Sequence, residues 1–324
     1  MPPFVSQKLA LLLVLCFTAV SEAQLRVATW NCAALRGDLS AVRNILAEIA
    51  EDDTTGWSTP PAVLILQEVN EGDQVTLRNL LNSEVPGPTW RIATYTNSDS
   101  GGAQACIYRG ELLTESVNDH RDIFTGAGRF SDRWRFTIDA TNGSTGFWVY
   151  SCHLKASQGS SNEELRESGT LAILNNIATL PSNANIFWGG DFNFYSNLEP
   201  GYDLIANTVG SNAIVDPLGN GSWSGSENAI KHTQSPRSTS SSGGLVGGGM
   251  DDRFDFVFSS QSAQEANGIT LIPGSYRALG NDGQHYNAAI NSGNNFYFPG
   301  EISRSNQLAD ALHDGADRQT QGGR

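Results

Sequence analysis

Residues 185–196, NIFWGGDFNFYS, join an apolar segment to two glycines and then place an acid and an amide one residue apart. The apolar half is rich in aromatic and β-branched residues, which predicts a buried strand. Gly189 and Gly190 let the backbone approach its neighbours closely at the end of that strand. Because residues two apart in an extended chain face the same side, we expect Asp191 and Asn193 to point into one cleft.

Other apolar segments also carry polar residues at or near their ends. They are TWN with Asn31, AVLILQE with Glu68, FWVYSCH with His153, and RFDFVF with Asp255. Burying so many polar groups without partners would cost several kcal/mol, and a shared divalent cation would remove that cost. Oxygen ligands without a Cys/His cluster suit Mg²⁺, Mn²⁺ or Ca²⁺ rather than structural zinc.

The pattern of short apolar segments predicts an α+β domain. Strands are expected at residues 25–30, 62–68, 103–108, 134–140, 147–153, 185–191 and 253–258. Helices are expected at residues 39–51, with Leu39, Val42, Ile45, Leu46 and Ile49 on one face, and at residues 163–180 after a Ser161/Glu164 capping box. Without strict βαβ alternation, this order predicts two sheets packed face to face and flanked by helices. The Ser/Gly-rich tract 235–249 is expected to be a mobile loop within this domain.

The N-terminus predicts export. An apolar run at residues 9–20 follows Lys8 and precedes SEAQ, which is typical of a signal peptide over residues 1–23, cleaved near Ala23 and Gln24. The run is too short for a membrane span, so we expect a secreted or periplasmic protein with no stable membrane insertion after cleavage. The mature domain would then cover residues 24–324.

Charge and cysteine content narrow the possible functions. The formal net charge of -14 disfavours broad electrostatic binding of nucleic acid, unless a local basic groove or bound cations override it. Cleavage would remove Cys16 and leave Cys32, Cys106 and Cys152. One disulfide with a free thiol and three buried thiols are both open.

The segments TWN, LQEV, SCHLKAS, WGGDFN and DDRFDFVF, taken in this order, resemble the endonuclease/exonuclease/phosphatase superfamily of deoxyribonuclease I-like proteins. The resemblance covers the chain from about residue 25 to the C-terminus. It implies a four-layer αββα sandwich of two mainly antiparallel sheets, with a Mg²⁺-dependent phosphoesterase site at one rim. Nucleic acid or another phosphate ester would be the substrate.

The resemblance also implies roles for individual residues. Glu68 resembles the main metal ligand and Asn31 its neighbour, and Asp317 would help to hold the ion. Asp191 resembles the residue that orients or deprotonates the attacking water, and Asn193 would hold the phosphate or that water. His153 resembles a histidine that contacts the phosphate. Asp255 resembles the carboxylate that orients a second histidine near the C-terminus.

The C-terminal end departs from the family pattern of Ser-Asp-His followed by an apolar strand. Ala316 and Asp317 match the first two positions, Arg318 takes the place of the histidine, and no apolar segment follows. An arginine cannot shuttle protons near neutral pH, and loss of the histidine is a simpler reading than its replacement by His285 or His313. The missing strand would leave a neighbouring strand with an unpaired edge.

Three functional readings therefore remain open. The first is an exported metal-dependent hydrolase of phosphodiesters or phosphomonoesters. The second is a catalytically impaired or non-catalytic secreted domain of the same fold, because of Arg318. A phospholipid substrate is a third possibility, since residues 296–298 could form a small apolar tip. His120, His232, His285 and His313 are expected to be histidines of polar loops, with His285 as a partial exception that could border the cleft, because GNDGQHYN lies between apolar segments.

Overall fold

The structure is a computed structural model that describes residues 25–51, 60–97, 99, 101–241, 243–264, 269–298 and 306. The predicted signal peptide, His313, Asp317 and Arg318 lie outside the described residues. Within the described ranges, no helix has the length and apolar character needed to cross a membrane.

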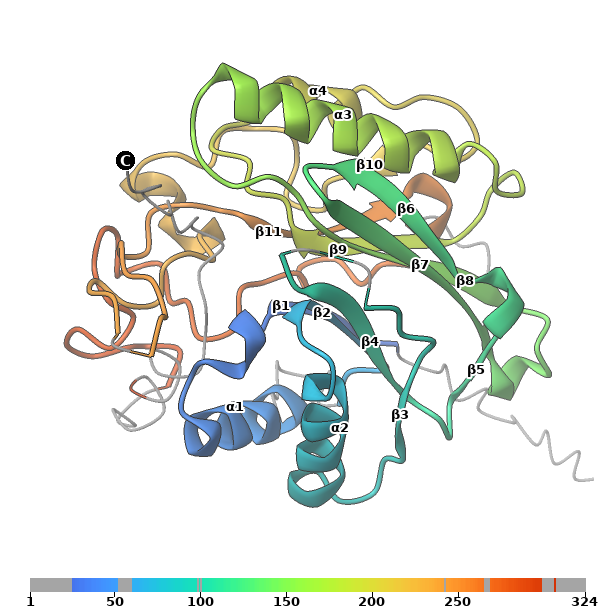
Figure 1. Cartoon of the computed structure of the whole chain (residues 1–324), viewed down its shortest axis with the longest axis horizontal. Helices are drawn as coiled ribbons and strands as arrows, with labels where there is room; N and C mark the ends of the chain where they lie inside the picture. Colours follow the sequence, from blue (N-terminus) through green and yellow to red (C-terminus); the bar gives the residue numbers. More distant parts are fainter. Residues whose placement is uncertain are drawn as a thin grey trace, which may run out of the picture.

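The first sheet has four strands and is covered on its outer face by two helices (Figure 1). Its strand order is β1 (Val27–Asn31), β2 (Val63–Val69), β4 (Ala103–Arg109) and β3 (Trp90–Ile92). β1 and β2 are parallel, and the other neighbours are antiparallel. The covering helices are α1 (Leu39–Glu51) and α2 (Asp73–Glu84).

The second sheet has seven strands and is covered on its own outer face by α3 (Ser160–Ile177) and α4 (Pro200–Ala206) (Figure 1). Its order is β10 (Ile214–Val215), β11 (Asp255–Ser260), β9 (Ile186–Asp191), β8 (Gly146–His153), β7 (Arg129–Ile138) and β5 (Leu113–Glu115), and β6 (Arg121–Gly126) also pairs with β7. Only the β8–β9 pair is parallel among these strands. Short 3₁₀ helices lie at Ala33–Leu35, Val117–Asp119, Asp139–Thr141, Ser226–Lys231 and Gln261–Ala263.

Alternation along the strands creates three apolar layers. In β2, Leu64 packs toward α1 and α2, whereas Ile65 packs between the sheets. In β8, Val149 packs between the sheets and Tyr150 packs toward α3. Each such side chain gains roughly 1.5–3 kcal/mol from full burial. The result is the predicted αββα sandwich, although each sheet is mixed because it contains one parallel pair.

Most predicted elements are present, with some errors. All seven predicted strands form, but the strand predicted at residues 134–140 begins at Arg129. The face predicted for α1 is buried except for Leu39, which is 49% exposed. The predicted capping box is wrong, because α3 begins at Ser160 after Gly159 and has no side-chain cap bond. Helices α2 and α4 and the strands β3, β5, β6 and β10 were not predicted.

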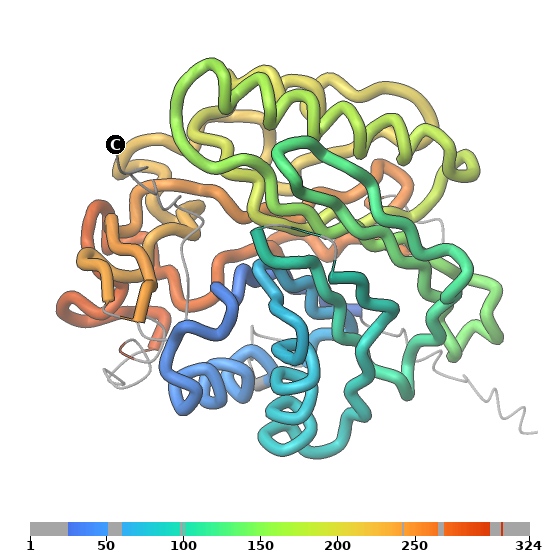
Figure 2. Tube along the Cα trace, viewed as in Figure 1, coloured from blue at the N-terminus to red at the C-terminus, as the bar shows by residue number. Residues whose placement is uncertain are grey.

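Strand β1 lies at the edge of the first sheet, where it pairs only with β2 among the described residues. The sequence predicted such an unpaired edge from the missing terminal strand. The last described segment, orange to red in Figure 2, runs beside this region, and its Leu279, Ile290 and Phe298 pack into the core under α1. A cavity of about 300 Å³, lined mainly by apolar side chains, remains along β1.

Two further sequence expectations concern thiols and the Ser/Gly-rich tract. Cys32, Cys106 and Cys152 are all buried and free, which selects the alternative of three buried thiols.

The described residues of the tract 235–249 contain no helix or strand. The tract is nonetheless packed in places, since Ser235 is 3% and Leu245 is 2% exposed. Its mobility stays a prediction.

Candidate active site

Asp191 lies at the centre of a row of polar residues at one rim of the second sheet. It ends β9, where its register partners are His153 on β8 and Asp255 on β11. Gly190 permits this arrangement, because a Cβ atom there would lie 2.2 Å from the carbonyl oxygen of Cys152. A Cβ at Gly189 would lie 2.7 Å from Ile65 of the other sheet. The two glycines therefore allow the close backbone approach that the sequence predicted.

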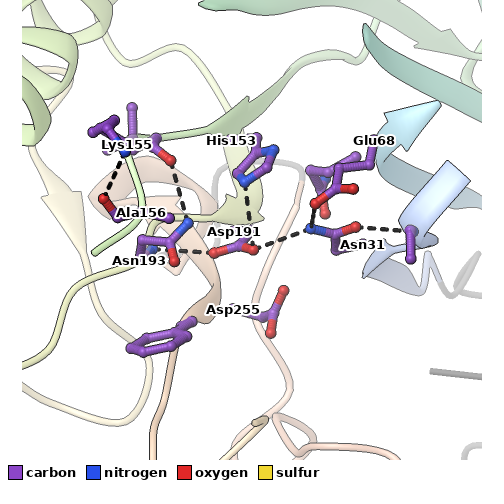
Figure 3. A network of polar contacts seen from close by, with 12 residues as sticks. Asn31, Glu68, His153, Lys155, Ala156, Asp191, Asn193 and Asp255 are labelled. Atoms are coloured by element: carbon purple, nitrogen blue, oxygen red, sulfur yellow. Dashed lines mark hydrogen bonds and ion pairs between the residues drawn. The ribbon is translucent and has the colours of Figure 1, made fainter. Parts of the chain in front are cut away.

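Asn31 connects this row to the first sheet (Figure 3). Its Nδ2 donates to Oε1 of Glu68 at 3.2 Å and to Oδ2 of Asp191 at 3.1 Å. Its Oδ1 accepts a hydrogen bond from the backbone N–H of Ala33 at 3.0 Å, which fixes the orientation of the amide. This geometry makes Asn31 an orienting residue for both carboxylates. A ligand role through its oxygen stays a prediction.

Glu68 reaches the rim because β2 is irregular at its end. The register with β4 shifts between Leu66 and Val69, and Glu68 has a φ of 52°. Such a bulge redirects one side chain out of the regular alternation. The carboxylate is nearly buried, and Arg36 Nη2 lies 3.4 Å from its Oε2.

Asn193 is held beside Asp191 by its backbone and by its side chain. Its N–H donates to Oδ1 of Asp191 at 3.1 Å, and its Nδ2 donates to the carbonyl oxygen of Leu154 at 3.2 Å. The Oδ1 atom of Asn193 is buried and accepts no hydrogen bond within the described part of the chain. A buried acceptor of this kind is expected to bind water or a ligand donor.

The buried carboxylates of the site favour the binding of a cation. Burial raises the pKa of Asp191 well above its usual value, and the charges of Asp255 and Glu68 raise it further. The hydrogen bond from Asn31 opposes this rise. His153 Nε2 lies 3.8 Å from Oδ2 of Asp191. Three carboxylates, two amides and one imidazole form a set of mainly oxygen donors that fits Mg²⁺ or Mn²⁺.

Two residues that sequence reasoning missed support the row. Arg129 donates through Nη1 to the carbonyl oxygen of His153 at 3.2 Å and also to that of Leu154. Its charge lowers the pKa of Asp191. Gln234 donates through Nε2 to Oδ2 of Asp255 at 2.9 Å. Neither contact had a signal in the sequence, because both join segments that are far apart in the chain.

The three described histidines other than His153 lie in loops, as predicted, but His232 and His285 are buried and the side chain of His120 is only 10% exposed. His232 is fully buried, with its ring nitrogens 3.2 Å and 2.6 Å from the carbonyl oxygens of Met250 and Trp223. His285 is 4% exposed and lies 2.8 Å from Asp282 and 3.1 Å from the carbonyl of Ser292. Both ring nitrogens of His285 are thus engaged, which argues against it as a replacement proton shuttle.

Residues 28–276 match the model of the Endonuclease/Exonuclease/phosphatase family, so the chain belongs to that family. No curated protein matches it.

Solved structures share the fold at low sequence identity. A family protein from Bacteroides thetaiotaomicron is 14% identical with a TM-score of 0.50, covering 73% of this chain and 83% of that one. TDP2 from D. rerio, complexed with single strand DNA product, is 18% identical with a TM-score of 0.49, covering 73% and 83%. The Bacteroides thetaiotaomicron mannosyl-6-phosphatase is 13% identical with a TM-score of 0.49, covering 74% and 86%.

Proposed function

We propose that this chain is an exported, divalent-metal-dependent phosphoesterase that hydrolyses a phosphodiester or phosphomonoester by in-line attack of water. The proposal rests on the side-chain amide of Asn31, which donates hydrogen bonds to Glu68 of one sheet and to Asp191 of the other. Side chains from separate segments thereby face one point at the sandwich rim (Figure 3).

Each residue of the site has a separate role in the proposed reaction. Asp191 orients the attacking water and accepts its proton, and Asn193 fixes Asp191 and offers its buried amide oxygen to that water. His153 donates a hydrogen bond to a phosphoryl oxygen as negative charge develops there. Asp255 is held by Gln234, where the family pattern pairs this carboxylate with a histidine.

A divalent ion fits beside Glu68. Glu68 would hold it, with help from Asn31 and with Asp317 as a further ligand from outside the described residues. When bound, the ion polarises the phosphoryl oxygen and offsets charge in the transition state. It would also favour the ionised form of Asp191, against the burial that raises the pKa of this carboxyl group.

The substrate class follows from charge and surface. A chain with a net charge of -14 favours a small phosphate ester or a short nucleic acid over long duplex DNA. A phospholipid is the least favoured substrate, because Phe298 is 6% exposed and packs into the core, whereas Phe296 is 67% exposed. Residues 296–298 thus do not form a continuous apolar tip.

A non-catalytic domain is the second candidate. It is favoured by Arg318 at the position of the terminal histidine and by the engagement of Asp255 with Gln234. Such a protein would bind divalent ions at the rim and would turn over no phosphate ester.

A substrate screen with a matched pair of variants separates the two candidates. Single-stranded DNA, duplex DNA, sphingomyelin, a generic phosphodiester and a generic phosphomonoester are each assayed with Mg²⁺ or Mn²⁺, and with EDTA as a control. We expect EDTA-sensitive hydrolysis that Asp191→Asn abolishes and Asp203→Asn, in α4, leaves unchanged. Metal binding without hydrolysis of any substrate would support the non-catalytic candidate. Equal activity of Asp191→Asn and wild type would refute the site.

A further inference from the structure

A second group of polar residues lies on the hairpin formed by β6 and β7. His120 immediately precedes β6 and is two residues from Asp122, so both side chains face the same side of the extended chain. Asp122 is the direct register partner of Asp132 on β7. Side chains of directly opposed residues lie on the same face of a sheet, so the three side chains meet there.

Distances confirm that the three side chains form a cluster. His120 Nε2 lies 3.5 Å from Oδ1 of Asp122 and 3.9 Å from Oδ2 of Asp132. One nitrogen and two carboxylate oxygens lie within 4.8 Å of one another. Two ligand atoms at about 2.1 Å from a tetrahedral ion would be separated by about 3.4 Å. The distance between His120 and Asp122 already matches this value, and the distances to Asp132 would have to shorten to hold a metal ion.

The buried atoms of the cluster lack hydrogen bonds. Asp132 is 2% exposed, and its Oδ2 has no hydrogen-bond partner among the described residues. The same holds for Nε2 of His120, whose side chain is 10% exposed. Buried polar atoms without partners are rare in native proteins, and an unseen ion is one of their standard explanations.

Charge also favours a cation at this position. Like charges directly opposed across a strand pair are destabilising, and Asp122 and Asp132 are so opposed. Burial raises the pKa of Asp132 to about 7, and the charge of Asp122 contributes to that rise, whereas His120 opposes it. A divalent ion would neutralise both carboxylates, whereas one protonated histidine would neutralise one.

Neighbouring residues hold the ligands in place. Thr96 donates through Oγ1 to Oδ1 of Asp122 at 2.8 Å. The His120 ring lies 5.8 Å from the ring of Trp134, whose Nε1 donates to the carbonyl oxygen of Thr94 at 2.7 Å. Such outer contacts orient ligands and raise metal affinity. They also connect the hairpin to the segment that follows β3.

We propose that His120, Asp122 and Asp132 form a second divalent-cation site, suited to Zn²⁺ or Mn²⁺, that is separate from the candidate active site. One imidazole and two carboxylates suit these ions better than Ca²⁺. The site is separate because its three ligands come from the hairpin of β6 and β7 and the residue before it, and none of them belongs to the candidate active site. It would stabilise the hairpin whether or not the chain hydrolyses a phosphate ester.

The test measures metal binding in a background where the candidate active site is weakened. The full chain carrying Glu68→Gln is stripped with EDTA and titrated with Zn²⁺ by calorimetry, and with Co²⁺ by visible absorption. The ligand variant is Asp122→Asn, whose side chain is 28% exposed, so the substitution should leave the fold intact. The matched control is Asp139→Asn, because Asp139 is exposed and accepts a hydrogen bond from Thr114 at 2.8 Å. His120→Gln is the second ligand variant.

We expect the Glu68→Gln protein to bind one equivalent of Zn²⁺. Adding either ligand substitution should abolish this binding or weaken it by more than about tenfold. The Asp139→Asn control should bind as the background does. Co²⁺ should give ligand-field bands in the background and in the control, and the ligand variants should lack these bands. Equal binding and equal Co²⁺ spectra in all four proteins would overturn the proposal. Absence of binding in the background would also overturn the proposal. In that case a protonated His120, rather than a metal ion, would balance the charge of the carboxylates.

Discussion

The side-chain amide nitrogen of Asn31 lies 3.2 Å from Oε1 of Glu68 and 3.1 Å from Oδ2 of Asp191, so one residue joins carboxylates from both sheets. The two acids come from β2 and β9, which belong to different sheets. Without a donor between them, two nearly buried carboxylates would repel each other across the rim. Asn31 therefore holds the two carboxylates at a fixed spacing.

Replacing this amide should impair both turnover and folding. Asn31→Leu removes two hydrogen bonds to charged groups, each worth about 1.5–3 kcal/mol, and we expect kcat to fall by about 100-fold. The measurement is the steady-state rate as a function of Mg²⁺ concentration. Asn207→Ala, which removes an exposed amide, is the control. Unchanged kcat in Asn31→Leu would show that the junction does not position catalytic groups.

A buried ion pair behind the site should be important for stability. Arg166 binds Glu199 through two hydrogen bonds of 2.7 and 2.9 Å, and its Nη1 donates to the carbonyl oxygens of Lys155 and Ser157. Glu199 also accepts the backbone N–H of Tyr195 at 2.8 Å. The pair thus connects α3 to the loops that follow His153 and Asn193.

Arg166→Met should lower the free energy of unfolding by about 3–5 kcal/mol, because it leaves the buried carboxylate of Glu199 without its charge partner. Denaturant unfolding followed by circular dichroism measures the change. Arg43→Met removes the exposed pair with Glu84 and should cost less than about 1 kcal/mol. Equal losses in the two variants would contradict the role assigned to Arg166.

The metal-free protein should lose stability as the pH rises from acid toward neutral. Burial raises the pKa of Asp252 from 3.8 to about 7, and the charge of Asp251 adds to the rise. The folded state then binds a proton that the unfolded state has released, so the contribution of Asp252 is present below pH 3.8 and is lost as the pH rises toward about 7. Asp252→Asn should flatten this part of the stability profile, measured in EDTA. A profile identical to that of wild type would contradict the shift.

Much of the fold and of the rim could be predicted because the signals are local. A short continuous apolar run, such as VLIL in VLILQEV, identifies a buried strand, and the polar residue near its end marks the rim of the sheet. Gly189 and Gly190 precede Asp191 because side chains there would collide with a neighbouring strand and with the other sheet. These constraints act over a few residues and therefore appear in the sequence.

The features that could not be predicted depend on contacts between distant segments. His120 was assigned to a polar loop, but the packing of β6 on β7 buries it against Asp132 and Trp134. The capping box failed because Gly159, two residues before Ser161, is the N-cap of α3, and the helix begins at Ser160. Arg129 and Gln234 support His153 and Asp255 only after the chain has folded.

The most direct test of the central claim is the Mg²⁺-dependent hydrolysis of a generic phosphodiester by the Glu68→Gln variant. The control is Glu164→Gln, which makes the same change on the exposed face of α3. If a cation is bound between the two sheets at Glu68, the variant should lose at least about 100-fold in activity at limiting Mg²⁺ while its unfolding curve and the control stay unchanged. Full Mg²⁺-dependent activity in folded Glu68→Gln would contradict the claim.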